Sequence, residues 1–353
     1  MLRVRVPSVA HLFPTPMNSG TSSGRAPESS SPRPARIVIV GAGPAGMGLA
    51  LCCHELGFAC TLLDPEGPGG ILRISGWPMS WSLGLPGGTG GEVAAKMAAH
   101  VRRENIPIRP ERALSIDVAA RCLRLEGADP LPYDALGVAT GVRFRRAELP
   151  GEDEAADSNW LFHRPPLSPQ TEALSGLPGR RVIVLGGGDN AFSTAVAEAA
   201  TAREVVIALR GEQPRAHART ILEAAQLANI SVRTGYRPLR MVSSPRREIH
   251  FLTPQGEKAL SCDAAYVHYG YAPNSEWTAG AMKLTREGHI EVDHEFRTSA
   301  PQVWAVGEVV GPAAPCVQTV LAHAPAAALS IARALRDEAA VAAALRQLES
   351  RAV

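Results

Sequence analysis

Two short runs of aliphatic residues stand out in the hydrophobic pattern, and each leads into a glycine-rich turn. The first, at 37–40, reads Ile-Val-Ile-Val and contains no polar position, as in a parallel strand that is buried on both faces. The second, Val-Ile-Val-Leu at 182–185, has the same character. After each turn the pattern predicts a helix and a further hydrophobic strand, at 58–63 and at 204–209. The chain therefore contains a β-α-β unit twice.

The first turn carries Gly41, Gly43 and Gly46 in G-x-G-x-x-G order. In this arrangement the first glycine permits the tight turn, the second lets the backbone approach a pyrophosphate, and the third lets the helix pack closely on the strand. The helix N-terminus then offers free amides to an anion. Asp64 ends the next strand, about 20 residues later, where a carboxylate accepts hydrogen bonds from ribose hydroxyls. We interpret this unit as a dinucleotide site rather than an accidental match.

The second turn repeats the arrangement with Gly186 and Gly188, and with Ala191 in the third slot. Here the following strand leads into Arg210, with Arg215 close behind. An arginine at this place suits a 2′-phosphate, whereas an acid suits a free ribose hydroxyl. The sequence thus favours NADPH over NADH at the second site. The alternative is that these arginines are ordinary solvated charges.

The rest of the chain reads as an alternation of short elements and irregular segments. An irregular Trp-, Pro- and Gly-rich stretch after Asp64 is long enough to indicate a functional loop, with an idle surface loop as the alternative. The pattern then predicts a helix at 92–104, short strands within 106–125, a buried strand at 133–141, a linker at 149–178, an edge hairpin at 288–293, a strand at 303–308 and an alanine-rich helix at 319–335.

Composition limits the classes of function. A length of 353 residues predicts two domains, and 36 basic against 34 acidic residues give no reason to expect a nucleic acid partner. Six cysteines without a Cys-x-x-Cys indicate neither a disulfide framework nor a metal site, so the cytoplasm is the default compartment. No segment is apolar for long enough to span a membrane, and residues 1–34 read as a disordered tail rather than a signal peptide.

The order of these motifs resembles the two-dinucleotide-binding-domain flavoproteins, and more closely their thioredoxin reductase-like branch. The segments that carry the resemblance are Gly41–Gly46, Gly69-Gly70, Ala139–Gly141, Gly186–Ala191 and Trp304–Val309. The resemblance implies an α/β fold of two Rossmann-like dinucleotide-binding domains, with an NAD(P)H domain inserted into an FAD domain. We expect a tail at 1–34, FAD-binding parts at 35–147 and 273–353, the latter including the C-terminal helices, and the NAD(P)H-binding domain at 148–272.

The resemblance also implies the residues that bind each cofactor. For FAD these are Gly41, Gly43, Pro44, Ala45, Gly46, Asp64, Gly69, Gly70, Ile71, Thr140, Gly141, Gly307, Glu308, Gln318, Thr319 and Val320. For NADPH they are Gly186, Gly188, Asp189, Asn190, Ala191, Arg210 and Arg215.

Four positions depart from the family pattern. Leu209 and Gly211 replace a histidine and an arginine of the arginine clamp, Ile71 replaces a glutamine, and Glu308 replaces the aspartate that contacts the FAD ribityl chain.

The largest departure is a missing pair of cysteines. Family members that reduce thioredoxin carry a Cys-x-x-Cys just before the second glycine turn, but this chain has no cysteine between Cys122 and Cys262. A redox pair needs a low-pKa thiolate with a resolving partner, so ordinary thioredoxin reductase chemistry is not expected. Two catalytic candidates remain: Cys316, close to the segment expected at the flavin, and His323, as a proton relay or a stacking partner, with a plain helical histidine as the alternative.

Three functions follow. The favoured one passes electrons from NADPH through FAD directly to an external acceptor such as ferredoxin or flavodoxin, as in the ferredoxin/flavodoxin–NADP reductases that resemble this branch. The second reduces a small or protein disulfide at the flavin or through Cys316, as thioredoxin and bacillithiol-disulfide reductases do. The third is a non-catalytic flavin-binding sensor.

The sequence also bears on partners. A basic run, Arg143, Arg145 and Arg146, fits either a docking patch for an acidic carrier or a solvated face. The resemblance implies a homodimer.

Overall fold

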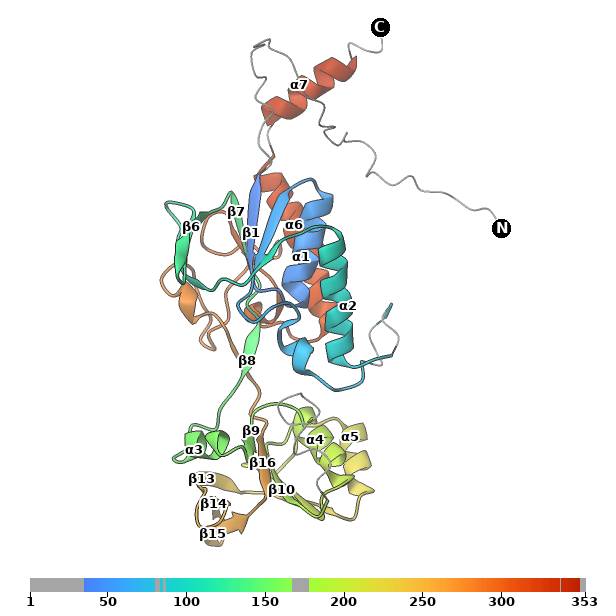
Figure 1. The fold of residues 1–353 in the computed structure, drawn as a ribbon, viewed down its shortest axis with the longest axis vertical. Helices are drawn as coiled ribbons and strands as arrows, with labels where there is room; N and C mark the ends of the chain where they lie inside the picture. Colours follow the sequence, from blue (N-terminus) through green and yellow to red (C-terminus); the bar gives the residue numbers. More distant parts are fainter. Residues whose placement is uncertain (1–34, 80–82, 85–86, 167–177, 337, 350–353) are drawn as a thin grey trace, which may run out of the picture. The chain divides into compact units, whose positions relative to one another are not determined.

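The computed structural model describes residues 35–79, 83–84, 87–166, 178–336 and 338–349. The predicted tail at 1–34 lies outside the described residues and stays a prediction. Two five-stranded parallel sheets organise the rest (Figure 1), so the predicted α/β class is confirmed.

The first sheet has the strand order β18-β7-β1-β2-β3. Its strands are β1 (Arg36–Val40), β2 (Ala59–Leu63), β3 (Ile108–Arg109), β7 (Ala135–Val138) and β18 (Val303–Ala305). The predicted apolar run of β1 lies at the centre because both of its faces are covered. Ile37 and Ile39 point into one core, and Val38 and Val40 point into the other.

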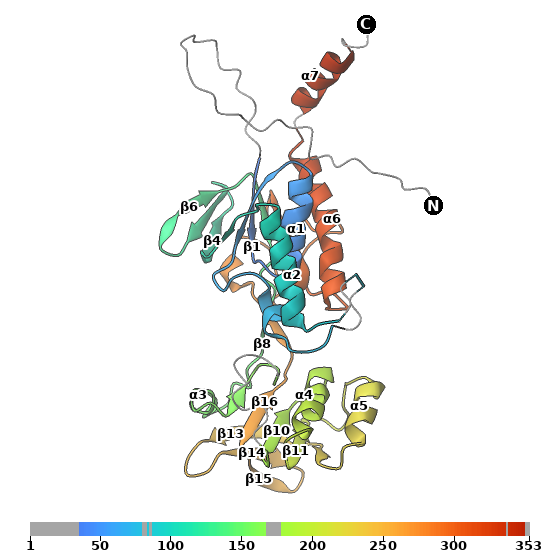
Figure 2. The same ribbon diagram turned by 45° about the vertical axis from the view of Figure 1, so that its right-hand side comes forward.

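Helices cover one face of this sheet and a small antiparallel sheet covers the other. The helices are α1 (Pro44–Glu55), α2 (Gly90–Arg103) and α6 (Val317–Ala334), which lie side by side in Figures 1 and 2. The small sheet consists of β4 (Ala113–Asp117), β5 (Cys122–Leu125) and β6 (Ala128–Pro132).

The second sheet has the order β12-β11-β10-β16-β9. Its strands are β9 (Leu161–Phe162), β10 (Arg181–Leu185), β11 (Glu204–Ala208), β12 (Ile230–Arg233) and β16 (Ala264–Val267). One face packs on α4 (Asp189–Ala199) and α5 (Ala218–Ala225). The other packs on α3 (Glu152–Asp157) and on the antiparallel strands β13 (Arg237–Val242), β14 (Glu248–Thr253) and β15 (Gly256–Ser261).

Three sequence expectations were wrong in detail. The expected linker at 149–178 contains α3 and β9, and β9 extends the second sheet by pairing with β16. The expected hairpin at 288–293 is reduced to one antiparallel bridge between Leu284 and Ile290. The strand expected at 303–308 ends at Ala305, and a 3₁₀ turn, η4 (Gly307–Val310), takes its last residues.

A two-stranded ribbon joins the segments that build the two sheets. It pairs β8 (Val142–Phe144) with β17 (Tyr271–Pro273), so the chain reaches the second sheet through one strand and returns through its neighbour. The segment that builds the second sheet is therefore inserted in the chain between two segments that build the first sheet, as the resemblance implies. The domain limits at 147/148 and 272/273 stay predictions. The remaining elements are η2 (Gly70–Ile74), η3 (Glu276–Thr278) and α7 (Glu338–Glu349). Among the described residues, no helix combines the length and the apolar character that crossing a membrane requires.

Candidate dinucleotide sites

The first glycine turn has the geometry of a pyrophosphate cradle. A Cβ at Gly41 would lie 2.3 Å from the carbonyl oxygen of Ala139, and one at Gly46 would lie 1.9 Å from the carbonyl oxygen of Gly41. Gly43, directly before α1, has no atom within 4 Å of the same position. Packing thus requires the first and third glycines, whereas the second leaves open space at a helix N-terminus, where an anion fits.

Two further predicted FAD segments converge on this turn. The amide of Gly69 donates to the carbonyl oxygen of Ala42 at 2.8 Å, and a Cβ at Gly70 would lie 3.3 Å from the Cα of Gly43. A Cβ at Gly307 would lie 2.8 Å from the Cβ of Ala45. Segments around residues 43, 70 and 307 therefore form one surface, and the close contacts at Gly70 and Gly307 leave room for small residues only at these two positions.

Asp64 is tied to the turn by its carboxylate. Oδ2 accepts the amide of Ala42 at 2.8 Å, and Oδ1 accepts the amide of Glu66 at 3.0 Å. Burial raises the pKa of Asp64, and these two hydrogen bonds oppose that rise. A carboxylate has about four acceptor positions, so two remain for the ribose hydroxyls that the sequence predicts as its partners.

Three further predicted FAD residues lie at the N-terminus of α6. Gln318, Thr319 and Val320 lie in the first turn of the helix, with Cys316 at its N-cap. The Cys316 Sγ lies 3.2 Å from the Thr319 hydroxyl. Burial raises the pKa of this thiol, but hydrogen bonds from Thr319 and from the Gln318 amide outweigh it, so the pKa falls below its ordinary value. This thiol therefore ionises more readily than an ordinary cysteine.

Glu308 and Thr140 also belong to the predicted FAD set, as does Ile71, which lies in η2 and is not fully buried. Burial raises the pKa of Glu308. The Thr140 hydroxyl donates to the carbonyl oxygen of Asn274 at 2.6 Å, and the Asn274 amide nitrogens donate to the carbonyl oxygens of Thr140 and Gly141. Thr140-Gly141 is thus anchored to the chain that returns from the second sheet.

His323 has a partner within the protein. Its Nδ1 accepts the amide of Gly307 at 3.1 Å, and its ring lies 4.5 Å from that of Phe296. Burial lowers the pKa of His323, so the neutral ring is favoured. This contact supports the plain structural alternative, and a catalytic role stays a prediction.

The second glycine turn repeats the geometry of the first. A Cβ at Gly186 would lie 2.4 Å from the carbonyl oxygen of His268, and one at Gly187 would lie 2.2 Å from the Cδ2 of Leu209. Gly188, before α4, has open space. Leu209 is buried beneath the turn, so the leucine that replaces the family's histidine serves packing and does not face a ligand.

The arginine-bearing loop after β11 folds back on this turn. The amides of Arg215 and Ala216 donate to the carbonyl oxygen of Gly187 at 2.7 and 3.1 Å. The amide of His217 donates to Asp189 at 2.7 Å. Both predicted clamp residues, Arg210 and Arg215, are at least partly exposed, and the loop anchors hold them beside the α4 N-terminus.

Sequence reasoning missed one neighbour of this clamp, Tyr269. The guanidinium carbon of Arg210 lies 4.2 Å from the centre of the Tyr269 ring. Asn190, predicted as an NADPH contact, donates to the hydroxyl of Tyr271 at 2.9 Å. Only the aromatic character of the run after β16 could have signalled these contacts.

The basic run 143–146 is engaged in internal contacts. Arg143 pairs with Glu276, Arg145 donates to the carbonyl oxygen of Tyr271, and Arg146 pairs with Asp153. These contacts favour a role in fixing the β8–β17 ribbon over a free docking patch.

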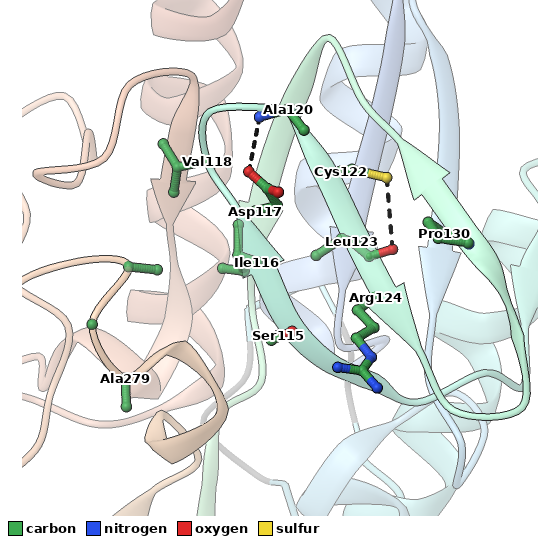
Figure 3. A pocket seen from close by; sticks show the side chains of 12 residues that line it. Ser115, Ile116, Asp117, Val118, Ala120, Cys122, Leu123, Arg124, Pro130 and Ala279 are labelled. Atoms are coloured by element: carbon green, nitrogen blue, oxygen red, sulfur yellow. Dashed lines mark hydrogen bonds between the residues drawn. The ribbon is translucent and has the colours of Figure 1, made fainter.

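Figure 3 shows a pocket formed by β4, β5 and residues 279–281. The Asp117 carboxylate in its wall accepts the amide of Ala120 at 2.8 Å and so closes its own turn. None of the predicted cofactor residues lines this pocket. Among the described residues, no group of three or more His, Cys, Asp or Glu side chains could hold a metal ion.

Comparison with known proteins places the chain in a family. The family model described as Pyridine nucleotide-disulphide oxidoreductase matches residues 35–330. The F subunit of alkyl hydroperoxide reductase from Pseudomonas putida is 26% identical over 307 residues, which cover 84% of this chain and 57% of that protein. The protein of the same name from Staphylococcus aureus (strain Mu50) is 24% identical, covering 82% and 56%. The chain thus spans somewhat more than half the length of these curated relatives.

Solved structures show the same fold. Thioredoxin reductase from Lactococcus lactis (FR conformation) has a TM-score of 0.77 at 21% identity, covering 85% of this chain and 98% of that one. Thioredoxin reductase from T. acidophilum has 0.74 at 23%, covering 84% and 96%. Bacillithiol disulfide reductase Bdr from Bacillus cereus has 0.71 at 15%, covering 85% and 99%. The predicted thioredoxin reductase-like fold is confirmed.

The family match settles the class of enzyme. Because it covers most of the chain, the predictions of a flavin-dependent oxidoreductase and of FAD and NADPH as cofactors are confirmed at the level of the family. The chain belongs to the pyridine nucleotide-disulphide oxidoreductase family.

Proposed function

We propose that this chain passes electrons from NADPH through FAD directly to an external acceptor protein such as ferredoxin or flavodoxin, without a redox-active cysteine pair. When bound, FAD supplies the hydride-accepting and electron-transferring chemistry that amino-acid side chains lack. The observation that carries the proposal is the combination of two formed dinucleotide turns with a chain that has no cysteine between Cys122 and Cys262.

Apart from Cys316, the remaining cysteines offer no substitute for the missing pair. Cys53 and Cys262 are buried, and burial raises the pKa of Cys262 to about 12. Cys60 is buried as well, and burial raises the pKa of Cys52. Cys122 is half-buried, and its Sγ lies 3.9 Å from the carbonyl oxygen of Leu123. A thiol whose ionisation is disfavoured is a poor nucleophile for disulfide exchange.

The residues of the two turns have separate tasks in this function. Gly43 and the α1 N-terminus would hold the FAD pyrophosphate, and Asp64 would orient its ribose. Gly188 and the α4 N-terminus would hold the NADPH pyrophosphate, with Arg210 and Arg215 at its 2′-phosphate. The α6 N-terminus would place its partial positive charge near the flavin and favour negative charge there.

Stopped-flow mixing tests the proposal. The FAD-loaded protein is mixed anaerobically with NADPH or NADH while the flavin absorbance is followed, and ferredoxin, flavodoxin, oxidised thioredoxin and small disulfides are then compared as acceptors. We expect faster bleaching with NADPH and turnover with a carrier protein. Absence of bleaching with either nucleotide near neutral pH would contradict both enzymatic functions and leave the non-catalytic sensor.

One observation favours a second candidate, a disulfide reductase that uses Cys316. Cys316 is the N-cap residue of α6, and the pKa of its thiol is lowered. In that function Cys316→Ser abolishes turnover of disulfides while dye reduction by NADPH stays intact. If disulfide turnover survives the substitution, or is absent from the unmodified protein, the cysteine-dependent candidate is excluded.

A further inference from the structure

The contact between Arg210 and Tyr269 crosses the carboxyl edge of the second sheet. Arg210 follows β11 and Tyr269 follows β16, and β10 lies between these two strands. With 4.2 Å between the guanidinium carbon and the ring centre, the two side chains meet over the end of β10. There the chain enters the second glycine turn, beside the place where a nucleotide would lie.

A cation–π contact of this kind restrains the arginine without occupying its hydrogen-bond donors. A guanidinium that lies over an aromatic ring uses its face, so the N–H groups at its edge stay available for paired hydrogen bonds to phosphate oxygens. Within the described part of the chain, no carboxylate forms an ion pair with Arg210. Its edge is therefore free for a ligand.

The tyrosine offers its ring rather than its hydroxyl. The Tyr269 hydroxyl oxygen is buried and has no hydrogen-bond partner among the described residues. Burial raises the pKa of Tyr269 to about 12, and the neighbouring Arg210 opposes that rise. A neutral ring with an unused hydroxyl indicates that the aromatic face is the part with a role.

The arginine clamp of this chain has one cation fewer than that of the resembled family, so the ordering of Arg210 by Tyr269 matters more. Gly211 stands where the resembled family has an arginine, and a Cβ there would meet no atom within 4 Å. Packing therefore does not require the glycine. Leu209 lies beneath the turn, which leaves Arg210 and Arg215 as the cations of the loop.

We propose that Tyr269 is a positioning residue that holds Arg210 ready for the 2′-phosphate of NADPH, so that one pre-ordered arginine compensates for the missing one. This inference rests on the proposed function, in which NADPH is the electron donor. It adds a determinant of selectivity between NADPH and NADH that lies far from the clamp in the sequence, at the end of another strand.

Steady-state reduction of a dye by the FAD-loaded protein tests the inference, with Tyr269→Leu and Tyr269→Phe compared. We expect Tyr269→Leu to raise the KM for NADPH by about 3- to 30-fold while kcat and the KM for NADH change by less than about twofold. Tyr269→Phe keeps the ring and should keep the KM for NADPH. Equal rises for both nucleotides, or none for NADPH, would overturn the inference.

Substitutions of the exposed arginine supply a second test that does not depend on Tyr269→Leu folding. If the planar guanidinium over the ring matters, Arg210→Lys should lose most of the selectivity for NADPH over NADH, nearly as much as Arg210→Gln loses. If only the positive charge matters, Arg210→Lys should retain this selectivity. In the Arg210→Gln background, Tyr269→Leu should have no further effect on the KM for NADPH. Retained selectivity with lysine, or additive effects, would contradict the inference.

The failure of the inference can be told from that of the proposed function. If neither nucleotide bleaches the flavin of the unmodified protein, the proposed function fails. If both nucleotides bleach it equally well, the oxidoreductase function stands, but the role of Tyr269 in 2′-phosphate selectivity is excluded.

Discussion

At the scale of single residues, the glycines of the first turn are of two kinds. A Cβ at Gly46 would lie 1.9 Å from a backbone oxygen, whereas Gly43 has open space. We therefore predict that Gly46→Ala lowers the free energy of unfolding by about 1–3 kcal/mol even without FAD. Gly43→Ala should change it by less than about 0.5 kcal/mol and should weaken only FAD binding. Denaturant unfolding of the FAD-free variants and FAD titration measure the two effects, and an equal loss of stability in both would refute the distinction.

His268 predicts a specific dependence of stability on pH. Burial, and then the neighbouring His163, lower the pKa of His268 to about 4, and its Nε2 lies 2.8 Å from the Thr194 hydroxyl. Because the folded pKa lies below the unfolded value of about 6.5, the unfolded chain takes up the proton first as the pH falls. Stability should thus decline from about pH 6.5 down to about pH 4, by at most about 1.4 kcal/mol per pH unit.

The variant His268→Gln isolates this contribution from those of the carboxylates. Between pH 7.5 and pH 5 its free energy of unfolding should fall by about 2 kcal/mol less than that of the unmodified protein. Urea unfolding at both pH values gives the comparison. Parallel declines in the two proteins would show that His268 is not the group that titrates.

The geometry of the two candidate cofactor turns could be predicted at this scale, because each glycine turn is local in the sequence. Gly41, Gly43 and Gly46 lie close together along the chain, and their roles follow from backbone geometry alone. Tyr269 was missed because its relation to Arg210 depends on strand order, which brings together residues from β11 and β16. The sequence shows only that Leu209 replaces the family's histidine, because the packing of Leu209 under Gly187 also depends on tertiary contacts.

At the scale of elements, long or strongly apolar segments were predicted well and short ones were not. The cores of β1 and β10 follow directly from their runs of β-branched residues. β9 has two residues and carries no periodicity, and its place in the sheet comes only from pairing with β16. Gly307 was expected to lie near the end of a strand. The close approach of Ala45 and a φ of +86° at Gly307 favour a turn there instead.

The Glu152 side chain holds the chain in place between the β8–β17 ribbon and the second sheet. Its buried carboxylate accepts the amides of Ala147, Glu148 and Leu149 and lies 2.6 Å from His163 Nε2. Burial tends to raise the pKa of Glu152, but its hydrogen bonds with His163 and with the backbone lower it overall. The side chain thus ties the end of the ribbon to α3 and to β9.

We predict that Glu152→Gln destabilises the protein, because an amide N–H₂ would face backbone donors. The loss should be about 2–4 kcal/mol in the free energy of unfolding, measured by denaturant unfolding at neutral pH. Glu154→Gln, at an exposed position of the same helix, is the matched control and should cost less than about 0.5 kcal/mol. Similar effects of the two substitutions would show that the network of Glu152 contributes little.

At the scale of the whole molecule, each parallel sheet has hydrophobic cores of its own. In the described part of the chain, the cores on the first sheet draw on residues 37–139 and 282–331, and those on the second on residues 155–267. No core among these described residues mixes the two sets. The β8–β17 ribbon is the covalent and hydrogen-bonded link, so the two sets can unfold as separate cooperative units.

This separation predicts how ligands shift thermal unfolding. Because NADP⁺ would bind at the second glycine turn, scanning calorimetry of the FAD-loaded protein should show two transitions, of which NADP⁺ raises one. At about 100 times its dissociation constant, NADP⁺ adds about 2.7 kcal/mol to that unit, which raises its midpoint by roughly 5–20 °C. Removal of FAD should lower only the other transition. NAD⁺ at the same concentration should give a smaller shift, and Arg210→Gln should remove the difference between the two nucleotides. A single transition that FAD and NADP⁺ both displace would show that the two cores unfold together.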